Sequence, residues 1–201
     1  MVKERRLYLE GGESKDDKIR CREAFSKLLE KAGFEGRMPR LSACGGRESA
    51  FDSFRTAHAI RKDHSYIGML LDSEDPMIDR EKTWEHLKRR DNWDKPDNAA
   101  DEQVLFMTTC METWIVADRA ALREHYQHKL QENALPPLEN LEQRSRHDVH
   151  NMLAHATRNC TNAYRKGKRS FEIFQTLQPA ALKKLPSFER AIRILKARLL
   201  H

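Results

Sequence analysis

Short apolar runs separated by longer amphipathic segments characterise the first half of the chain. The apolar runs predict four strands, at residues 5–10, 38–44, 66–71 and 104–107. Between the first three strands, apolar side chains recur at helical spacing over residues 16–32 and 48–62. This order predicts an α/β fold in which a mostly parallel, four-stranded sheet is flanked by helices.

The apolar positions of the predicted helices define the faces that we expect to pack on the sheet. In the first helix they are Ile19, Phe25, Leu28, Leu29 and Ala32. In the second helix they are Phe51, Phe54, His58 and Ile60. A shorter helix is expected over residues 80–90, with Trp84 and Leu87 facing inward.

The second half of the chain has helical patterns interrupted by proline and glycine. The interruptions are Pro136-Pro137, Gly167, Pro179 and Pro186. The last helix has an apolar stripe made of Phe188, Ala191, Ile192, Leu195 and Leu199. We therefore expect a catalytic core over residues 1–118 and a helical C-terminal extension, packed on that core, over residues 119–201.

Positive charge is concentrated at the C-terminus. The chain of 201 residues has 37 Lys and Arg against 31 Asp and Glu, a net charge of +6. Residues 164–201 contain ten basic and two acidic side chains, a net charge of +8 that leaves about −2 for the rest. A slightly acidic remainder and a basic C-terminal segment suit a metal site beside a bound polyanion. Each single Lys or Arg is more simply explained as a solvent-exposed residue of a surface helix.

Cysteine spacing and hydropathy bear on the cellular compartment. Cys21, Cys44, Cys110 and Cys160 are widely scattered, without the paired spacing of a zinc cluster or a disulfide framework. No apolar run approaches the length of a membrane span, and the first strand is too short for the core of a signal peptide. We expect a cytoplasmic protein with no membrane partner.

Carboxylates follow two of the predicted strands. Glu10 follows the first, and Asp72, Glu74 and Asp75 follow the third. Because ligands of open parallel sheets collect beyond the carboxyl ends of the strands, these oxygens can meet there and hold Mg²⁺ or Mn²⁺. Asp72 and Glu74 can point to one side, whereas Asp75 needs a turn to join them. Alternatively, Asp72 caps a helix, and Glu74 and Asp75 are solvated residues of a turn.

Two further parts of the sequence carry candidate chemistry. Glu112 is surrounded by apolar residues, so it either faces the acidic cluster or pairs with a basic side chain. Arg47 follows Gly45-Gly46, where a phosphate can be received, or the glycines simply make a tight turn. The densest basic run contains Lys166, Lys168 and Arg169, which we expect to hold backbone phosphates of a nucleic acid.

The segments Leu7-Tyr8-Leu9-Glu10-Gly11-Gly12 and Leu70-Leu71-Asp72-Ser73-Glu74-Asp75-Pro76 resemble the strand-Glu-Gly and strand-Asp-x-Asp signatures of the Toprim family. Nearly the whole chain is also similar to a small bacterial family, the domain-of-unknown-function family numbered 4276. The segments that carry this second resemblance are residues 43–47, 84–87, 110–114 and 169–173. The resemblance implies a Toprim-like, Rossmann-like fold and a relation to the OLD-like nucleases.

The resemblance also implies roles for individual residues. Glu10 matches the Toprim glutamate that acts as a general acid or base or as a metal ligand, and Asp72 matches the first metal-binding aspartate. Glu74 stands where a second aspartate is usual, so Asp75 can serve instead. For a second acidic residue after the Glu-Gly pair, Glu13, Asp16 and Asp17 are candidates. Glu112 resembles an acidic position before Trp in related small Toprim proteins.

Together these patterns predict a metal-dependent nuclease that uses Glu10, Asp72, Glu74 and Glu112, with Glu13 or Asp75 as further metal ligands. Small relatives accompany ABC-type ATPases in bacterial defence against phage, so the resemblance implies such a partner and such a role. A homodimer is also compatible with the sequence. The alternative is a non-catalytic Toprim module that binds nucleic acid or a protein partner.

Overall fold

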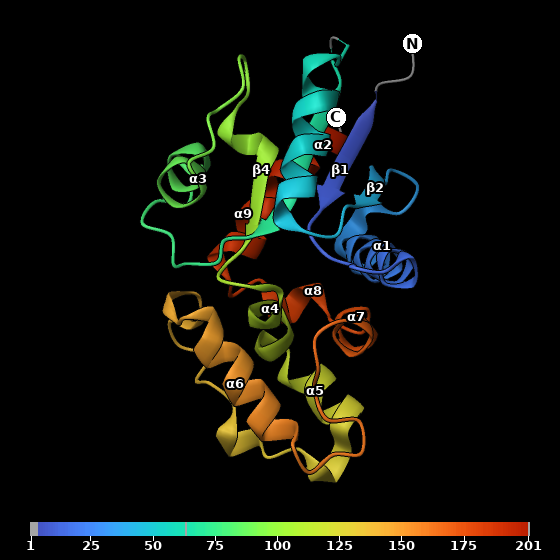
Figure 1. The fold of residues 1–201 in the computed structure, drawn as a ribbon. Helices are drawn as coiled ribbons and strands as arrows, with labels where there is room; N and C mark the ends of the chain where they lie inside the picture. Colours follow the sequence, from blue (N-terminus) through green and yellow to red (C-terminus); the bar gives the residue numbers. More distant parts are fainter. Residues whose placement is uncertain (1–3, 63, 201) are drawn as a thin grey trace.

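A single parallel sheet forms the centre of the molecule (Figure 1). The computed structural model describes residues 4–62 and 64–200. The strands are β1 (Arg5–Leu9), β2 (Arg40–Ala43), β3 (Tyr66–Asp72) and β4 (Val104–Met107), in the spatial order β2-β1-β3-β4. Each neighbouring pair is parallel, as the sequence predicts.

Alternation along the strands divides the core into two apolar clusters. Leu7, Leu9 and Leu70 face one side of the sheet, where they pack with α1 (Lys15–Leu29) and the C-terminal helices. Tyr8, Met69 and the other inward side chains of the second face pack with α2 (Arg47–Ala59) and α3 (Thr83–Asp91). Successive side chains of a strand point to opposite faces, so both faces of the sheet are covered by helices.

The C-terminal helices complete the larger cluster. They are α4 (Met111–Ala117), α5 (Arg119–Tyr126), α6 (Arg146–Thr157), α7 (Lys168–Phe174), α8 (Pro179–Leu182) and α9 (Pro186–Leu199). Phe174 of α7 lies with its ring centroid 4.5 Å from that of Phe25 in α1, and Phe188 of α9 lies 5.0 Å from Trp114 in α4. The C-terminal helices therefore share one core with the sheet.

The first two helices differ from the sequence-based expectations in where the first one ends and in the burial of two isoleucines. The first helix continues through a π-helical segment, Glu30–Phe34, in which Gly33 has a positive φ of 96°. Ile60, expected on an inward face, is 79% exposed because α2 ends at Ala59. Ile19 is also mostly at the surface, at 38% exposed.

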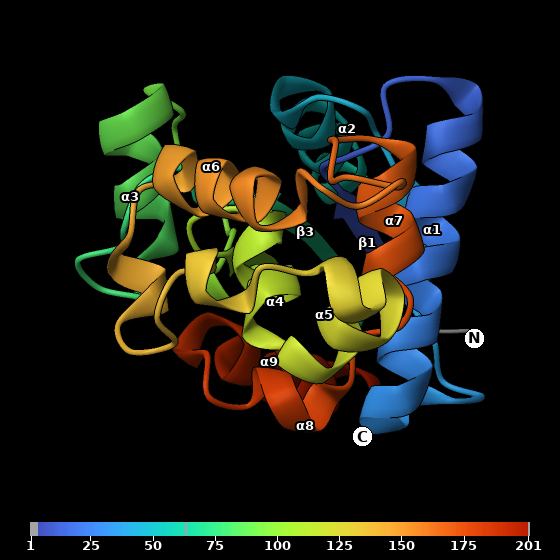
Figure 2. The ribbon, with the colours of Figure 1, turned by 90° about the horizontal axis from the view of Figure 1, so that it is seen from below.

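Helices α4, α5, α6 and α7 lie beyond the carboxyl ends of the strands (Figures 1 and 2). Short 3₁₀ segments connect parts of this region, at Gln127–Lys129, Glu132–Ala134 and Leu141–Gln143, and another, Asp101–Gln103, precedes β4. Among the described residues, no helix combines the length and the apolar character that crossing a membrane requires.

Candidate metal centre

The strand order places two carboxylates at the switch point of the sheet, where the chain stops adding strands on one side of β1 and begins to add them on the other. From β1 the chain goes to β2 on one side and then to β3 on the other, which creates a crevice at the carboxyl ends of β1 and β3. Glu10 follows β1, and its backbone N–H donates to the Leu70 carbonyl at 3.0 Å. The backbone N–H of Asp72, the last residue of β3, donates to Oε2 of Glu10 at 3.1 Å.

Three carboxylates converge at this crevice. Glu10, Asp72 and Glu74 each offer one oxygen, and these three atoms lie within 4.8 Å of one another. Oδ1 of Asp72 is buried and has no hydrogen-bond partner. Glu74 has a positive φ of 69°, and its backbone N–H donates to the Thr109 carbonyl at 2.7 Å. Non-glycine residues with this backbone conformation concentrate at functional sites.

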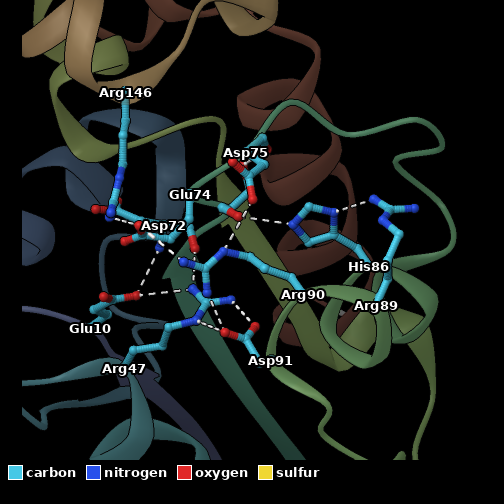
Figure 3. A network of polar contacts seen from close by, with 11 residues as sticks. Glu10, Arg47, Asp72, Glu74, Asp75, His86, Arg89, Arg90, Asp91 and Arg146 are labelled. Carbon is cyan, nitrogen blue, oxygen red and sulfur yellow. Dashed lines mark hydrogen bonds and ion pairs between the residues drawn. The ribbon is translucent and has the colours of Figure 1, made fainter.

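Arg47, the first residue of α2, holds Glu10 in relation to the end of β3 (Figure 3). Its Nη1 lies 3.6 Å from Oε2 of Glu10 and donates to the backbone carbonyl of Asp72. Its Nε and Nη2 donate to Asp91 at 3.0 and 2.6 Å, and its guanidinium carbon lies 5.2 Å from the ring centroid of Trp93. A bidentate carboxylate pair and an aromatic face fix the guanidinium in one orientation.

Two further arginines neutralise Glu74. Nη2 of Arg90 in α3 lies 3.3 Å from Oε2 of Glu74, and Arg146 at the start of α6 forms an ion pair with the same oxygen. Arg90 also approaches Asp75 at 3.4 Å, but the Asp75 side chain is 69% exposed. Figure 3 shows these arginines converging on Glu74 from different elements. Glu74 is therefore shared between the acidic cluster and an arginine network.

A cavity of about 350 Å³ opens beside Glu10 and Asp72. Glu112 of α4 lines it, is only 1% exposed, and accepts a hydrogen bond of 2.6 Å from the hydroxyl of Tyr164. Nζ of Lys166 lies 3.9 Å from Oε1 of Glu112. Glu112 thus faces the acidic cavity and also approaches a basic side chain, which are the two arrangements expected from its sequence context.

Burial favours the protonated forms of Asp72 and Glu10. Burial raises the pKa of Asp72 well above its usual range, and the charges of Glu10 and Glu112 add to the increase, while Lys166 opposes it. Burial also raises the pKa of Glu10, against the opposing effect of Arg47. For Tyr164, burial and the neighbouring Glu112 raise the pKa well above its ordinary value, so the hydroxyl remains a donor.

A sequence profile for a family described as "Domain of unknown function (DUF4276)" matches residues 13–196. The chain belongs to the DUF4276 family. No curated protein and no solved structure matches this chain. This family membership confirms the resemblance to the domain-of-unknown-function family numbered 4276. The chemistry of the site has to be argued from its own residues.

In this DUF4276 member, the predicted acids occupy different positions around the crevice. Glu10, Asp72 and Glu74 form the cluster, and Glu13 lines the cavity without belonging to it. Asp17, another candidate, also lines the cavity and accepts a hydrogen bond of 2.9 Å from the hydroxyl of Ser14, the N-cap of α1. The Asp75 side chain points toward Arg90 and solvent (Figure 3).

The predicted phosphate-binding residues also differ in their surroundings. The Lys166 side chain is 61% exposed and lines the cavity. Lys168 is similarly exposed but pairs with Glu172 at 3.6 Å, and Arg169 donates to the carbonyl of Ala163. Arg47 is mostly buried, and its guanidinium is already engaged by groups of the protein.

Several residues of the site carry no local sequence signal. Arg90, Asp91 and Arg146 look like ordinary charged surface positions, and Tyr164 follows a polar segment. They reach the site because α3, α6 and the segment before α7 meet the carboxyl edge of the sheet. The sequence signal that located the site was the presence of Glu10 and Asp72 directly after apolar runs.

Proposed function

We propose that this chain is a divalent-metal-dependent nuclease that hydrolyses phosphodiester bonds of DNA or RNA. The observation that carries the proposal is the convergence of oxygens from Glu10, Asp72 and Glu74 within 4.8 Å at the switch point of the sheet. Oxygen-only donors suit Mg²⁺ or Mn²⁺, and the unpartnered buried Oδ1 of Asp72 suits a cation ligand. When bound, such a cation supplies an activated water and stabilisation of the leaving oxygen.

The chain's own side chains provide the rest of the proposed site. Lys166 is positioned to bind a phosphate oxygen in the cavity and to offset the charge that develops during hydrolysis. Oε1 of Glu112 accepts the hydrogen bond from the Tyr164 hydroxyl and lies 3.9 Å from the Lys166 ammonium, which it helps to orient. Arg47, clamped by Asp91, keeps Glu10 at a fixed distance from Asp72.

A Toprim relationship, including a relation to the OLD-like nucleases, is part of the proposal. It is supported by the position of Glu10 after β1 and of Asp72 at the end of β3, because these are neighbouring parallel strands. Glu74 departs from the second aspartate of that signature, and its longer arm also reaches Arg90 and Arg146.

The biological role extends the same resemblance. We propose that the nuclease acts in the cytoplasm as the effector of a bacterial antiviral system, with an ABC-type ATPase as its partner. Restraint by a partner fits a nuclease that would otherwise damage the nucleic acid of its host. Association as a homodimer is compatible with this role.

A non-catalytic binding module is the second candidate, and one observation favours it. Arg90 and Arg146 already neutralise Glu74 without a cation, so an ion at the cluster has to share that carboxylate with them. Under this alternative, the acidic residues would maintain the arrangement of the helices around the sheet, and nucleic acid would bind without being cut.

The proposal is tested by incubating plasmid DNA and tRNA with the purified protein in Mg²⁺ or Mn²⁺. We expect cleavage that chelation stops and that Glu10→Gln and Asp72→Asn each reduce at least about a hundredfold. Glu23→Gln, an exposed position on α1, is the matched control and should cut normally. If no cleavage is detected, the assay is repeated in the presence of the ATPase encoded nearby. Absence of cleavage in that assay, with nucleic-acid binding retained, would support the binding module.

A further inference from the structure

The carboxylates of the proposed site are recessed. The side chains of Glu10 and Glu74 are 17% and 11% exposed, and that of Glu112 is 1% exposed. The adjoining cavity of about 350 Å³ is near the small end of the range of about 300–1,000 Å³ for small-molecule pockets. It offers room for roughly one nucleotide unit, and a reacting phosphate must enter it to reach Asp72.

The cavity is bounded by two different parts of the molecule. Gly11 and Gly45, in the loops after β1 and β2, exchange backbone hydrogen bonds of 2.8 and 3.1 Å and form one wall. Met111 at the start of α4 and the segment Lys166-Gly167 before α7 also line the cavity, whereas Phe171 of α7 packs beside Gly11, where an added Cβ would lie 3.5 Å from its ring. Viewed from the carboxyl end of the sheet, α4 and α7 lie in front of the strands (Figure 2). A strand that reaches the cavity therefore meets the loops after β1 and β2 as well as the start of α4 and the segment before α7.

The charge inside the cavity favours a single backbone. Five carboxylates line it, from Glu10, Glu13, Asp17, Asp72 and Glu112, against one ammonium, from Lys166. A double helix would bring two phosphate backbones toward these carboxylates, whereas an unpaired strand brings one. Met111, which is only partly buried, gives the unpaired strand apolar surface for a sugar or a base.

We infer that the strand that enters the site is unpaired, so the substrate class is single-stranded or frayed nucleic acid and not a continuous duplex. The inference rests on the proposed nuclease function. Enzymes whose reactive centre lies inside a pocket act on single strands or must first extract the nucleotide from the stack. Both DNA and RNA offer this chemistry.

The first test compares one labelled strand, free and annealed to its complement, as DNA and as RNA, with the wild-type protein in Mn²⁺. We expect the free strand to be cut about tenfold faster or more, because the annealed strand must open first. Equal or faster cutting of the duplex would overturn the inference while leaving the nuclease intact.

A binding measurement separates this inference from the nuclease proposal. Fluorescence anisotropy with Asp72→Asn should show about tenfold tighter binding of the free strand than of the duplex, whether or not the wild type cuts. Tighter free-strand binding without cleavage would contradict the nuclease but support the inference. Absent binding, or equal binding of both forms, would overturn the inference.

A substitution at Gly46 tests whether the strand enters the cavity. Gly46 lines the cavity and has an ordinary φ of −74°, and a Cβ added there meets no atom within 4 Å. Gly46→Phe should weaken free-strand binding at least about tenfold by filling space, whereas Thr56→Phe, at an exposed position of α2 that does not line the cavity, should bind like the wild type. Unchanged binding by a folded Gly46→Phe protein would place the strand elsewhere and overturn the inference.

Discussion

At the level of single residues, Asp72 has the most unusual environment in the site. Its Oδ1 is buried without a hydrogen-bond partner, and the charges of Glu10 and Glu112 disfavour its ionisation. Folding without a cation therefore leaves a carboxyl group that resists ionisation. This residue should dominate both metal binding and the pH dependence of stability.

The raised pKa of Asp72 predicts how the stability of the metal-free protein changes with pH. The folded state holds the proton of Asp72 more tightly than the unfolded state does, so Asp72 costs no stability at pH values below about 4 and costs progressively more as pH rises from there through its raised pKa. In EDTA at neutral pH, Asp72→Asn should raise the melting temperature by several degrees, and Asp52→Asn on α2 should not. A lower melting temperature for Asp72→Asn would contradict this.

Lys166 and Lys168 offer a second test at this scale. Their side chains are 61% and 64% exposed, but only Lys166 lines the cavity, whereas Lys168 pairs with Glu172. Lys166→Ala should reduce strand cleavage about a hundredfold, because it removes the ammonium group that we propose binds a phosphate oxygen in the cavity. Lys168→Ala makes the same change of charge and should reduce cleavage by no more than about twofold. Equal losses in the two variants would indicate a general charge effect.

At the level of elements, α9 is attached to the sheet through Arg190. This side chain is 6% exposed and donates to the carbonyls of Val104 and Asp101 at 3.0 and 3.1 Å. The sequence suggested only a basic helix face, and Arg190 was one of the ten basic residues of the C-terminal region. Its role depends on carbonyl groups about 90 positions earlier in the chain, which no local pattern reveals.

Arg190 and Arg193 make a matched pair for measuring this attachment. Arg190→Met should lower the free energy of unfolding by about 2–4 kcal/mol, because it leaves buried carbonyls unpaired. Arg193 pairs with Glu81 at 2.7 Å, but its side chain is 59% exposed, so Arg193→Met should cost no more than about 1 kcal/mol. Denaturation in urea measures both values, and equal costs would contradict the buried role of Arg190.

The strands were the most predictable elements. All four were located correctly from sequence, and the two whose apolar runs are buried on both faces are β3 and β4, whereas β2 at the edge of the sheet is only partly buried. Glu10 and Asp72 were predictable for the same reason, since a charge after a buried run marks the end of a strand. The arginine network around Glu74 was not predictable, because Arg90 and Arg146 depend on how distant helices pack.

At the level of the whole molecule, the sheet and the C-terminal helices share the larger apolar cluster. Leu9 and Phe25 from the first part of the chain belong to the same cluster as Phe174 and Phe188 from the last. The division near residue 118 therefore separates segments of sequence that contribute to one core. The carboxylate cluster and the adjoining cavity both depend on this shared core.

A fragment of residues 1–118 should accordingly fail to fold by itself. Exposing each large apolar side chain of the shared cluster costs about 1.5–3 kcal/mol, and several such losses exceed a typical stability of 5–15 kcal/mol. Calorimetry should show one cooperative transition for the full chain and none for the fragment. A fragment that melts cooperatively near the temperature of the full chain would show two independent units.

The most direct test of the central claim is titration calorimetry of Mn²⁺ into metal-free protein at neutral pH. We expect saturable binding in the wild type, retained in Asp52→Asn and lost in Asp72→Asn, because Glu10, Asp72 and Glu74 form the ligand cluster. Binding that is absent in the wild type, or unchanged in Asp72→Asn, would contradict a metal centre at the carboxyl ends of β1 and β3.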